Sequence, residues 1–308
     1  MSQEIKTLKY VQTMIVDRNK IESYLDKLGQ ECDFQVNFPT NGIETPDGYL
    51  ITFGCSWTYG VGSFYESEMT EKEYKQIAWD TELTYQHSWR KIVADKLNLI
   101  NINFSIGGST NELQFMMAEI FFSSDLWKFI EESSKKVIVL WGTTSLLRKT
   151  VWSVKDKQNI TVWLDVDSGM DRDKTQRIIN IFSNIYTKLF FDSDNEINNL
   201  CHRMNFWNTF FEKVNVRNFW FDTFISFNYP KQIKNLIGVE ETDRDLLFYL
   251  CKINGNIINE KKIHRSTWSI DNKKIEFLYK NQLVNPYSFH PTRECHKQLG
   301  EFFIQKLL

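Results

Sequence analysis

Apolar residues near the N-terminus fall into two groups, and neighbours within each group are three or four positions apart. This spacing is typical of one face of a helix, so it predicts one or two amphipathic helices between residues 3 and 30. A connector rich in proline, glycine and asparagine follows from Phe38 to Gly48. We expect residues 1–47 to form a helical extension that packs on the main body.

From residue 48 onwards, short apolar runs alternate with helical patterns. The runs Tyr49–Phe53, Leu99–Phe104 and Val137–Trp141 are predicted to be strands, and the last is uniformly apolar, as a strand covered on both faces should be. Helices are predicted between them over Ser88–Leu97 and Asn111–Phe122. Such alternation favours an α/β fold in which helices flank a parallel sheet.

The rest of the chain adds a predicted strand over Asn218–Phe224 and a closing helix over about Thr292–Leu307. We expect one domain over residues 48–308, interrupted by two insertions. The insertions are predicted at about 150–175, where two apolar runs can pair as a hairpin, and at 228–284, where charged and apolar residues mix.

The composition narrows the class of protein. A chain of 308 residues with 42% hydrophobic residues can bury a sizeable core. The net charge of -2 argues against nucleic-acid binding, which usually needs a basic excess. Glu4, Lys6 and Lys9 interrupt the region where a secretory signal needs an apolar core, and the apolar runs are too short to span a bilayer. We therefore expect a soluble, cytoplasmic protein without a membrane or nucleic-acid partner. The sequence leaves the oligomeric state open.

Neither a metal nor a cofactor is expected. The five cysteines are scattered and form no CxxC pair, so the sequence suggests neither a zinc knuckle nor a disulfide framework. This pattern favours a reducing compartment. The acidic segment Asp165–Asp173 resembles a calcium loop at first sight. Its glycine is the fifth residue and Gln176 is the twelfth, whereas an EF-hand needs glycine sixth and glutamate twelfth. We interpret it as a solvated acidic turn.

The most informative segment is Phe53–Gly60, which reads FGCSWTYG. Ser56 follows a predicted strand directly and has glycines on both sides, at the place where an open α/β sheet presents its ligand crevice. Backbone N–H groups at a helix start can stabilise a developing oxyanion there. For an isolated serine of this kind, the better interpretation is a helix cap in a tight turn.

Three further segments change that interpretation. Asn103–Asn111 contains Gly107 and Gly108 at the end of a predicted strand, where a glycine lets the backbone approach a bound oxygen. Trp141–Ser145 ends the next strand. Ser288–Thr292 contains His290 at a loop-to-helix corner, from which the imidazole could meet Ser56 in space and act as its base.

Together and in this order, the four segments resemble the conserved blocks of the SGNH/GDSL hydrolase family. The resemblance covers roughly residues 48–150 and 285–307. The motifs GCSWTYG and GGSTN, with His87-Ser88-Trp89 between them, look like a divergent branch found in bacteria and phages. A bias towards Asn, Lys, Ile and Phe, typical of AT-rich genomes, agrees with such a source. The resemblance implies a three-layer, flavodoxin-like sheet with helices on both faces.

The resemblance also implies roles for single residues. Ser56 matches the family's nucleophile and His290 its general base. Gly108 matches the oxyanion glycine, and Gly107 is the alternative if the register shifts by one. The backbone N–H of Ser56 would be a further donor. Trp57, next to the nucleophile, is expected to contact substrate or to support the site.

Two positions depart from the family's pattern. Thr144 stands where the family has its oxyanion asparagine; a threonine hydroxyl can donate one hydrogen bond, and Asn111 is a candidate stand-in. Tyr287 stands where the family has an aspartate that orients the histidine. A backbone carbonyl or another acid such as Asp222 or Glu294 could replace the aspartate, or a serine–histidine dyad could act alone.

Other residues near these blocks have local interpretations. Arg148, one helical turn beyond the third block, is a candidate for a substrate charge or a structural partner, with a solvated helix arginine as the alternative. Cys55, where the family usually has an aspartate, is interpreted as a small buried thiol. His87 is expected to be structural, and His296 to be a solvated surface residue on the last helix.

The leading functional hypothesis is an esterase that removes an acyl group, such as acetyl from a carbohydrate, from a small-molecule or glycan ester. Two alternatives stay open. One is a binding or interaction module with weakened chemistry. The other is an acyltransferase that passes the same acyl group to a sugar hydroxyl.

Overall fold

The computed structural model describes residues 28, 34–40, 45–153, 158–164, 174–223, 226–227, 229–230, 233–238, 245–255 and 272–308. Most of the predicted helical extension, residues 1–47, lies outside the described residues. So do the acidic segment Asp165–Asp173 and much of the predicted insertion over 228–284. The division of the chain into an extension and one decorated domain stays a prediction.

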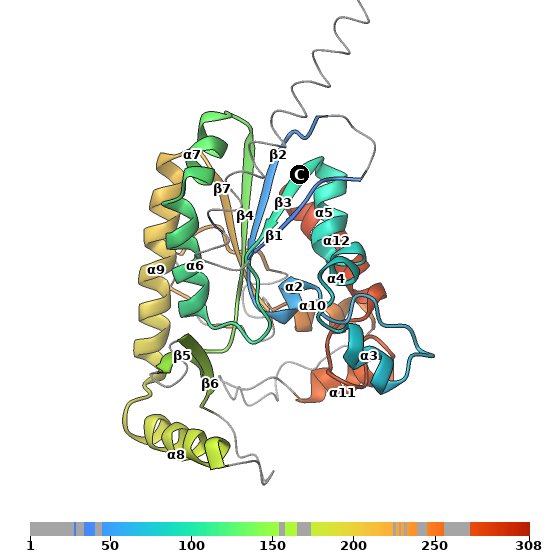
Figure 1. Ribbon diagram of the computed structural model, residues 1–308, viewed down its shortest axis with the longest axis vertical. Helices are drawn as coiled ribbons and strands as arrows, with labels where there is room; N and C mark the ends of the chain where they lie inside the picture. Colours follow the sequence, from blue (N-terminus) through green and yellow to red (C-terminus); the bar gives the residue numbers. More distant parts are fainter. Residues whose placement is uncertain are drawn as a thin grey trace, which may run out of the picture.

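A five-stranded sheet forms the centre of the molecule, in the order β1-β3-β2-β4-β7 (Figure 1). Four of these strands are parallel, as the alternating pattern predicts. The exception is β1, which runs antiparallel to β3 at one edge and was not predicted, because three residues give too short a pattern to recognise. The strands are β1 (Gln35–Asn37), β2 (Gly48–Phe53), β3 (Leu99–Asn103), β4 (Lys136–Thr143) and β7 (Arg217–Asp222).

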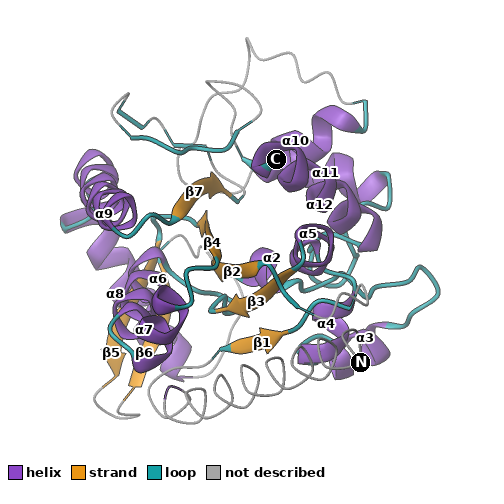
Figure 2. Ribbon diagram, turned by 90° about the horizontal axis from the view of Figure 1, so that it is seen from above, coloured by secondary structure: helices purple, strands orange, loops and turns teal. Residues whose placement is uncertain are grey.

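Helices cover both faces of the sheet, which confirms the predicted three-layer α/β architecture (Figure 2). One face carries α5 (Trp89–Leu97) and α12 (Arg293–Leu307). These two pack so closely that a Cβ on Gly300 would lie 2.7 Å from the Ile92 side chain. The other face carries α6 (Asn111–Phe122), α7 (Asp125–Glu132) and α9 (Ser193–Lys213).

The core is built from aromatic rings that stack across the central strands. Phe53 on β2 stacks on Trp141 of β4 at 4.2 Å, and Trp141 stacks on Trp220 of β7 at 4.7 Å. All residues of β2 are buried, as expected of a parallel strand with helices on both sides. This packing holds the carboxyl ends of β2, β4 and β7 in register.

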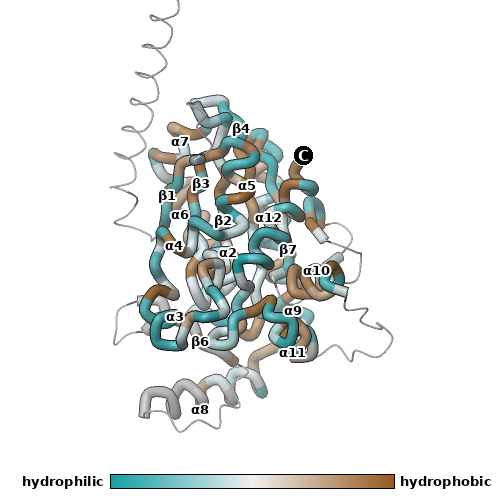
Figure 3. Tube along the Cα trace, turned by 90° about the vertical axis from the view of Figure 1, so that its right-hand side faces the viewer, coloured by the Kyte–Doolittle hydropathy of each residue, from teal (hydrophilic) through white to brown (hydrophobic). Residues whose placement is uncertain are grey.

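The remaining elements surround the carboxyl edge of the sheet. β5 and β6 form the hairpin predicted in the first insertion, and Arg148 pairs with Trp163. Figure 3 shows that α3 is largely hydrophilic whereas α10, whose leucines are buried, is largely hydrophobic. Among the described residues, no helix is both long and apolar enough to cross a membrane. These elements are α2 (Ser56–Tyr59), α3 (Glu71–Ile77), α4 (Thr81–Gln86), β5 (Arg148–Ser153), β6 (Gln158–Trp163), α8 (Lys174–Leu189), α10 (Leu246–Ile253) and α11 (Asn272–Lys280).

The pair α3 and α4 was not predicted from the sequence, although a local signal exists. Thr70 and Glu73 form a capping box at the start of α3, the S/T-x-x-E pattern that marks a helix N-terminus. Asp80 caps α4 through the backbone N–H of Leu83. Because the exposed face of α3 is highly charged, its apolar periodicity is weak and the caps are the clearer sign.

Candidate active site

The residues of the four sequence blocks lie at the carboxyl edge of the sheet. Ser56 begins α2 just after β2, and the loop that follows β3 is tied to the β2 loop by Ile106 N–H donating to Gly54 O (3.2 Å). The segment after β4 is tied to the start of α6 through Thr144 and Asn111. Because parallel strands end on the same edge, blocks that are far apart in sequence are neighbours there.

Ser56 Oγ lies 2.7 Å from His290 Nε2. The serine is the first residue of α2 and its side chain is 6% exposed. The helix cap is Cys55, which makes no side-chain capping bond, so the interpretation of Ser56 as an ordinary cap is wrong. The two side chains that the sequence analysis paired are therefore in direct hydrogen-bond contact.

The other nitrogen of His290 contacts a serine. His290 Nδ1 lies 2.9 Å from Ser288 Oγ, and Ser288 Oγ donates its single proton to Asn285 Oδ1 (2.9 Å). With that proton donated to Asn285, the Ser288 oxygen accepts from Nδ1–H of the imidazole, the tautomer in which Nε2 presents a lone pair towards Ser56. By the same reasoning, Tyr74 Oη donates to Ser288 Oγ, at 2.6 Å.

None of the acids considered from the sequence contacts His290 among the described residues. Asp222 accepts hydrogen bonds from Thr143, Tyr229 and the Phe227 N–H, and Glu294 lies in the first turn of α12. Among the described residues the imidazole thus has no carboxylate partner. Besides the Ser288 hydroxyl, a hydrogen bond with the Ser288 backbone also acts on it. Sequence reasoning missed Ser288 because it looked for an acid three residues before the histidine.

The loop that carries His290 is held from inside by one buried amide. Asn285 Oδ1 accepts from the N–H of Tyr287 (3.2 Å) and of Ser288 (2.8 Å), and Asn285 Nδ2 donates to His290 O (3.0 Å). Phe289 adopts a left-handed conformation with φ of 55°, which is unfavourable for such a residue and lies next to the histidine. Asn285 is fully buried, so it fixes the loop before any substrate arrives.

Residues from the β2–α5 connection support the histidine loop from outside. Tyr287, at the family's aspartate position, donates from Oη to Met69 O (2.7 Å), and its ring lies 5.6 Å from that of Tyr74. Gly62 has φ of 91°, and a Cβ there would lie 2.5 Å from Pro291 O. Tyr287 therefore supports the loop and does not orient the imidazole.

The two candidate oxyanion glycines differ in their surroundings. Gly108 has φ of 75°, and no atom lies within 4 Å of the position of a Cβ, so this face of its peptide is open. Gly107 is covered, because a Cβ there would lie 2.3 Å from ring carbons of Trp79. Of the two, only Gly108 has an open space beside it that a ligand could enter.

Thr144 and Asn111 form a reciprocal pair. Asn111 Nδ2 donates to Thr144 O and Thr144 N–H donates to Asn111 Oδ1, both at 2.9 Å. The Asn111 amide is therefore engaged in holding the loop after β4, which argues against its use as an oxyanion donor. The Thr144 hydroxyl is buried and has no hydrogen-bond partner among the described residues, which leaves it able to donate.

Arg148 and Trp57 lie close to Ser56 but inside the protein. Arg148 is on strand β5, not on a helix, and is 5% exposed, so the solvated alternative is wrong. Its guanidinium hydrogen-bonds the Cys55 thiol and lies 3.5 Å from Ser109 O. Trp57 is 5% exposed within the core, and its carbonyl accepts from Trp89 Nε1 (3.3 Å), a supporting role.

The two other histidines near the site differ in burial. His87 ends α4 and is half-buried, and its structural role stays a prediction. His296 is fully buried and its Nδ1 accepts from the Trp89 N–H (3.4 Å), so the prediction of a surface residue is wrong. It lies on the same face of α12 as Leu299, Gly300 and Phe303, which packs on α5. Burial lowers its pKa to about 3.

Burial also lowers the pKa of His290 to about 4. A hydrogen bond with the Ser288 backbone acts in the opposite direction, and the nearby charge of Arg148 lowers the pKa further. At neutral pH the imidazole is therefore uncharged, which is the form that can accept a proton from a serine hydroxyl.

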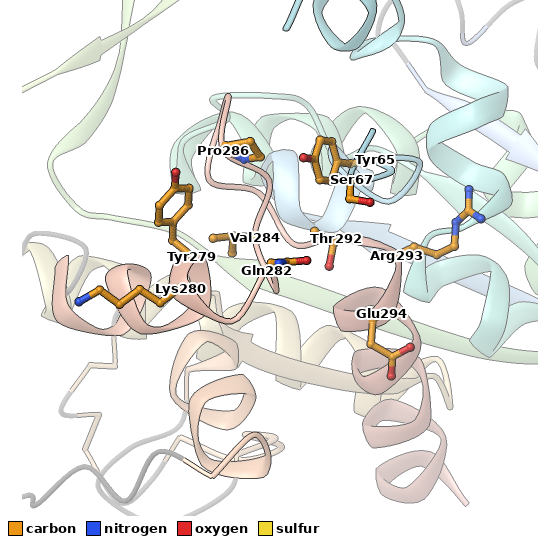
Figure 4. A pocket seen from close by; sticks show the side chains of 10 residues that line it. All are labelled: Tyr65, Ser67, Tyr279, Lys280, Gln282, Val284, Pro286, Thr292, Arg293 and Glu294. Carbon is orange, nitrogen blue, oxygen red and sulfur yellow. The ribbon is translucent and has the colours of Figure 1, made fainter. Parts of the chain in front are cut away.

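A pocket of about 570 Å³ lies on the outer side of the histidine loop (Figure 4). Residues that flank the loop, such as Val284 and Thr292, form its inner wall, but neither Ser56 nor His290 lines it. Its remaining lining residues are Tyr65, Ser67, Tyr279, Lys280, Gln282, Pro286, Arg293 and Glu294. The pocket is thus separate from the candidate active site.

No known family model matches the chain, and no curated protein matches it. Similar solved structures include an acetyl xylan esterase, Est2A, from Butyrivibrio proteoclasticus, with 9% identity and a TM-score of 0.42 over 86% of this chain. A protein described as lipolytic and of the G-D-S-L family, from Desulfitobacterium hafniense, has 9% identity and a TM-score of 0.36, with 83% of this chain and 98% of that one covered.

A family two carbohydrate esterase from Clostridium thermocellum, solved in complex with cellohexaose, has 10% identity and a TM-score of 0.33 over 85% of this chain. The chain spans 64% of the length of this protein and of Est2A.

Proposed function

We propose that the chain is a serine esterase of the SGNH/GDSL type, with Ser56 as nucleophile and His290 as general base. The observation that carries the proposal is the distance of 2.7 Å between Ser56 Oγ and His290 Nε2. A serine hydroxyl is a weak nucleophile unless a neighbouring base accepts its proton. The proposed substrate is an acyl ester of a small molecule or glycan, and an O-acetylated carbohydrate is the first candidate.

In the first half of the proposed reaction, Ser56 Oγ attacks the ester carbonyl carbon while its proton passes to His290 Nε2. The tetrahedral intermediate then collapses. Its bond to the alcohol oxygen breaks, and the imidazolium returns the proton to that oxygen. Water repeats the same sequence on the acyl-Ser56 ester, which releases the carboxylic acid and restores the serine.

The negative oxygen of the tetrahedral intermediate needs hydrogen-bond donors. Ser56 N–H is in the first turn of α2, where helical N–H groups lack intrahelical acceptors, and we assign it as one donor. The backbone N–H of Gly108 is the second, because its peptide is open to a ligand. The Thr144 hydroxyl is the third candidate, in place of the family's asparagine.

The proposed function can be tested with a fluorophosphonate probe, which reacts only with an activated serine. We expect the wild type to be labelled on a peptide containing Ser56 and the Ser56→Ala variant to remain unlabelled, as read by mass spectrometry. The wild type should also hydrolyse p-nitrophenyl acetate. If the folded wild type is neither labelled by the probe nor able to hydrolyse p-nitrophenyl acetate, the esterase proposal is wrong and a binding module is favoured. A labelled protein that turns over only with a sugar acceptor would instead be an acyltransferase.

Activity should persist to unusually low pH. The base works only when neutral, and its pKa is about 4 and not the ordinary 6.5. We expect kcat/KM for p-nitrophenyl acetate to stay constant from neutral pH down to about pH 5 and to fall by half near pH 4. An acid limb near 6.5 would contradict the buried, neutral imidazole.

The fraction of folded protein must be followed at each pH as a control. The unfolded state binds more protons than the folded state below pH 6.5, because His290 and His296 have lowered pKa values. Stability therefore falls as the pH drops from about 6.5 towards 4. Asp222 partly offsets this loss, since burial raises its pKa to about 6 and the folded state takes up a proton there.

A further inference from the structure

A second cavity, of about 520 Å³, lies beside the candidate active site at the β1 edge of the sheet. It shares residues with the elements that carry the proposed chemistry: Tyr59 ends the short helix that Ser56 begins, and Gly107 precedes the proposed oxyanion donor Gly108. β1, α3 and α4 lie together on this side of the molecule (Figure 2). Neither Ser56 nor His290 lines this cavity, so it is a candidate subsite for a part of the substrate beyond the ester group.

Aromatic rings form the walls of the cavity. Trp79 is 58% exposed although it is a large apolar side chain, and it stands on the turn between α3 and α4. The Asp80 cap of α4 and the bond from Asp80 N–H to Ile77 O (2.9 Å) fix this turn, and the ring rests against Gly107. Tyr59 faces it with the ring centroids 6.1 Å apart and tilted by 58°. An exposed tryptophan held in this way offers a flat apolar surface to a ligand.

Polar side chains complete the lining and are fixed in advance. Asn103 Oδ1 accepts from Thr52 Oγ1 (2.8 Å), and Asn103 Nδ2 donates to Gln35 Oε1 (3.4 Å). Gln35 Oε1 also accepts from Arg90 Nη2 (3.4 Å). Arg90 is fully buried, so this network is rigid and holds the amide of Gln35 at the cavity.

One polar group in the lining lacks a partner. Ser105 is 3% exposed, and its hydroxyl makes no hydrogen bond with any described residue. A buried hydroxyl without a partner costs free energy, so such groups call for an explanation by a ligand or an ordered water. The lining contains no ionised side chain, which favours a neutral ligand.

We propose that this cavity binds a pyranose ring of the substrate, with the C–H face of the sugar on Trp79 and its hydroxyls bonded to Ser105, Asn103 and Gln35. This inference rests on the proposed esterase function and makes the substrate a carbohydrate ester. A pyranose has the matching chemistry, because it is neutral, has one apolar face and carries hydroxyls around its edge. A long acyl chain would leave the Ser105 hydroxyl unsatisfied.

The pocket in Figure 4 matches a sugar less well. Lys280, Arg293 and Glu294 line it, and Arg293 forms an ion pair with Glu66 (3.0 Å). None of its lining residues carries a buried side-chain group without a hydrogen-bond partner. The two cavities therefore differ in charge and in whether a buried polar group lacks a partner.

Binding can be tested without catalysis in the Ser56→Ala protein. Saturation-transfer NMR would be recorded with the methyl pyranosides of glucose, galactose, xylose and N-acetylglucosamine. We expect at least one sugar to bind and an added Trp79→Ala substitution to weaken its binding at least about tenfold. Added Gly107→Ala should weaken it in the same direction, because the new methyl group displaces the Trp79 ring. Added Phe206→Ala is the matched control: it removes a ring that is 63% exposed on α9 and should leave sugar binding unchanged.

The second measurement is the steady-state kinetics of protein that retains Ser56. We expect Trp79→Ala to lower kcat/KM for the mono-O-acetyl ester of the bound sugar at least about tenfold relative to kcat/KM for p-nitrophenyl acetate. Equal sugar binding with and without Trp79, or no binding of any of the four sugars, would overturn the subsite. The subsite would also be overturned if the protein preferred hexanoyl esters of the sugar to acetyl esters and Trp79→Ala abolished this preference. The cavity would then hold an acyl chain.

The two proposals fail separately. If the fluorophosphonate probe labels Ser56 but no sugar binds, the subsite is wrong and the esterase stands. If sugars bind through Trp79 but the probe never labels Ser56, the chain is a carbohydrate-binding protein and the esterase is wrong.

Discussion

The Ser56→Ala variant, the His290→Ala variant and the variant with both changes are expected to lose p-nitrophenyl acetate hydrolysis to the same extent, by about 10³- to 10⁶-fold in kcat. The two side chains act as one unit across the 2.7 Å contact. Without the imidazole the serine keeps its proton, and without the serine the imidazole has no nucleophile to activate. The losses should therefore not add.

Steady-state kinetics of the three variants would measure this effect, with residual rates compared with the uncatalysed reaction. His87→Ala is the matched control, because it removes a half-buried histidine that ends α4 outside the site. Thermal unfolding of each variant would show that the fold is retained. Additive losses, or a Ser56→Ala variant with more than about a tenth of wild-type activity, would refute the proposed pair.

Ser288→Ala is expected to lower kcat by about 10- to 150-fold with little change in KM. Ser288 accepts the Nδ1 proton of His290 at 2.9 Å, and this bond strengthens when the imidazole becomes charged in the transition state. A hydrogen bond to a charged group contributes about 1.5–3 kcal/mol, and each 1.36 kcal/mol is a factor of ten in rate. Ser288 is thus a positioning residue, since it acts through His290.

Three comparisons separate this role from general support of the loop. Ser288→Thr keeps the hydroxyl and should recover most of the lost activity. Tyr74→Phe removes only the neighbouring O–H that donates to Ser288 and should cost less than Ser288→Ala. The downfield proton NMR signal of His290 Nδ1–H should move or disappear in Ser288→Ala. Wild-type kcat in Ser288→Ala would mean that another group orients the imidazole.

The serine partner also explains how the site can lack the family's aspartate. Burial lowers the pKa of the imidazole to about 4, and the hydrogen bond with Ser288 offsets this only in part, whereas a carboxylate in its place would raise the pKa further. The hydrogen bonds instead form a chain: His290 bonds to Ser288, and Ser288 donates its hydroxyl proton to Asn285 Oδ1, which also accepts from the Ser288 N–H. We expect the imidazole to be well oriented but weakly basic.

Much of the fold and the proposed pair could be predicted because the signals are local. A buried strand that ends in a glycine turn can be recognised within about ten residues, as in Phe53–Gly60. The order of the strands then brings their carboxyl ends together without further information. His290 was a candidate because it precedes the last helix, although it is 234 positions from Ser56.

Other predictions failed where burial depends on the partner element. His296 looks like a surface residue in its own helix, but α5 covers that face of α12. Arg148 was expected on a helix and lies on a strand, beside Cys55. In both cases the local sequence specifies a polar side chain, and only the neighbouring element decides whether water reaches it.

The sequence by itself determined the α/β class, the parallel order of the main strands and the strand-end position of Ser56, because each follows from apolar periodicity and glycine within a short segment. Only the tertiary structure decided what His290 Nδ1 contacts, how the Asn111 amide is used and that Trp79 rests on Gly107. These contacts join residues from separate elements, such as Tyr74 and Ser288, 214 positions apart. The direction of a hydrogen bond and the covering of a side chain arise only when such elements pack.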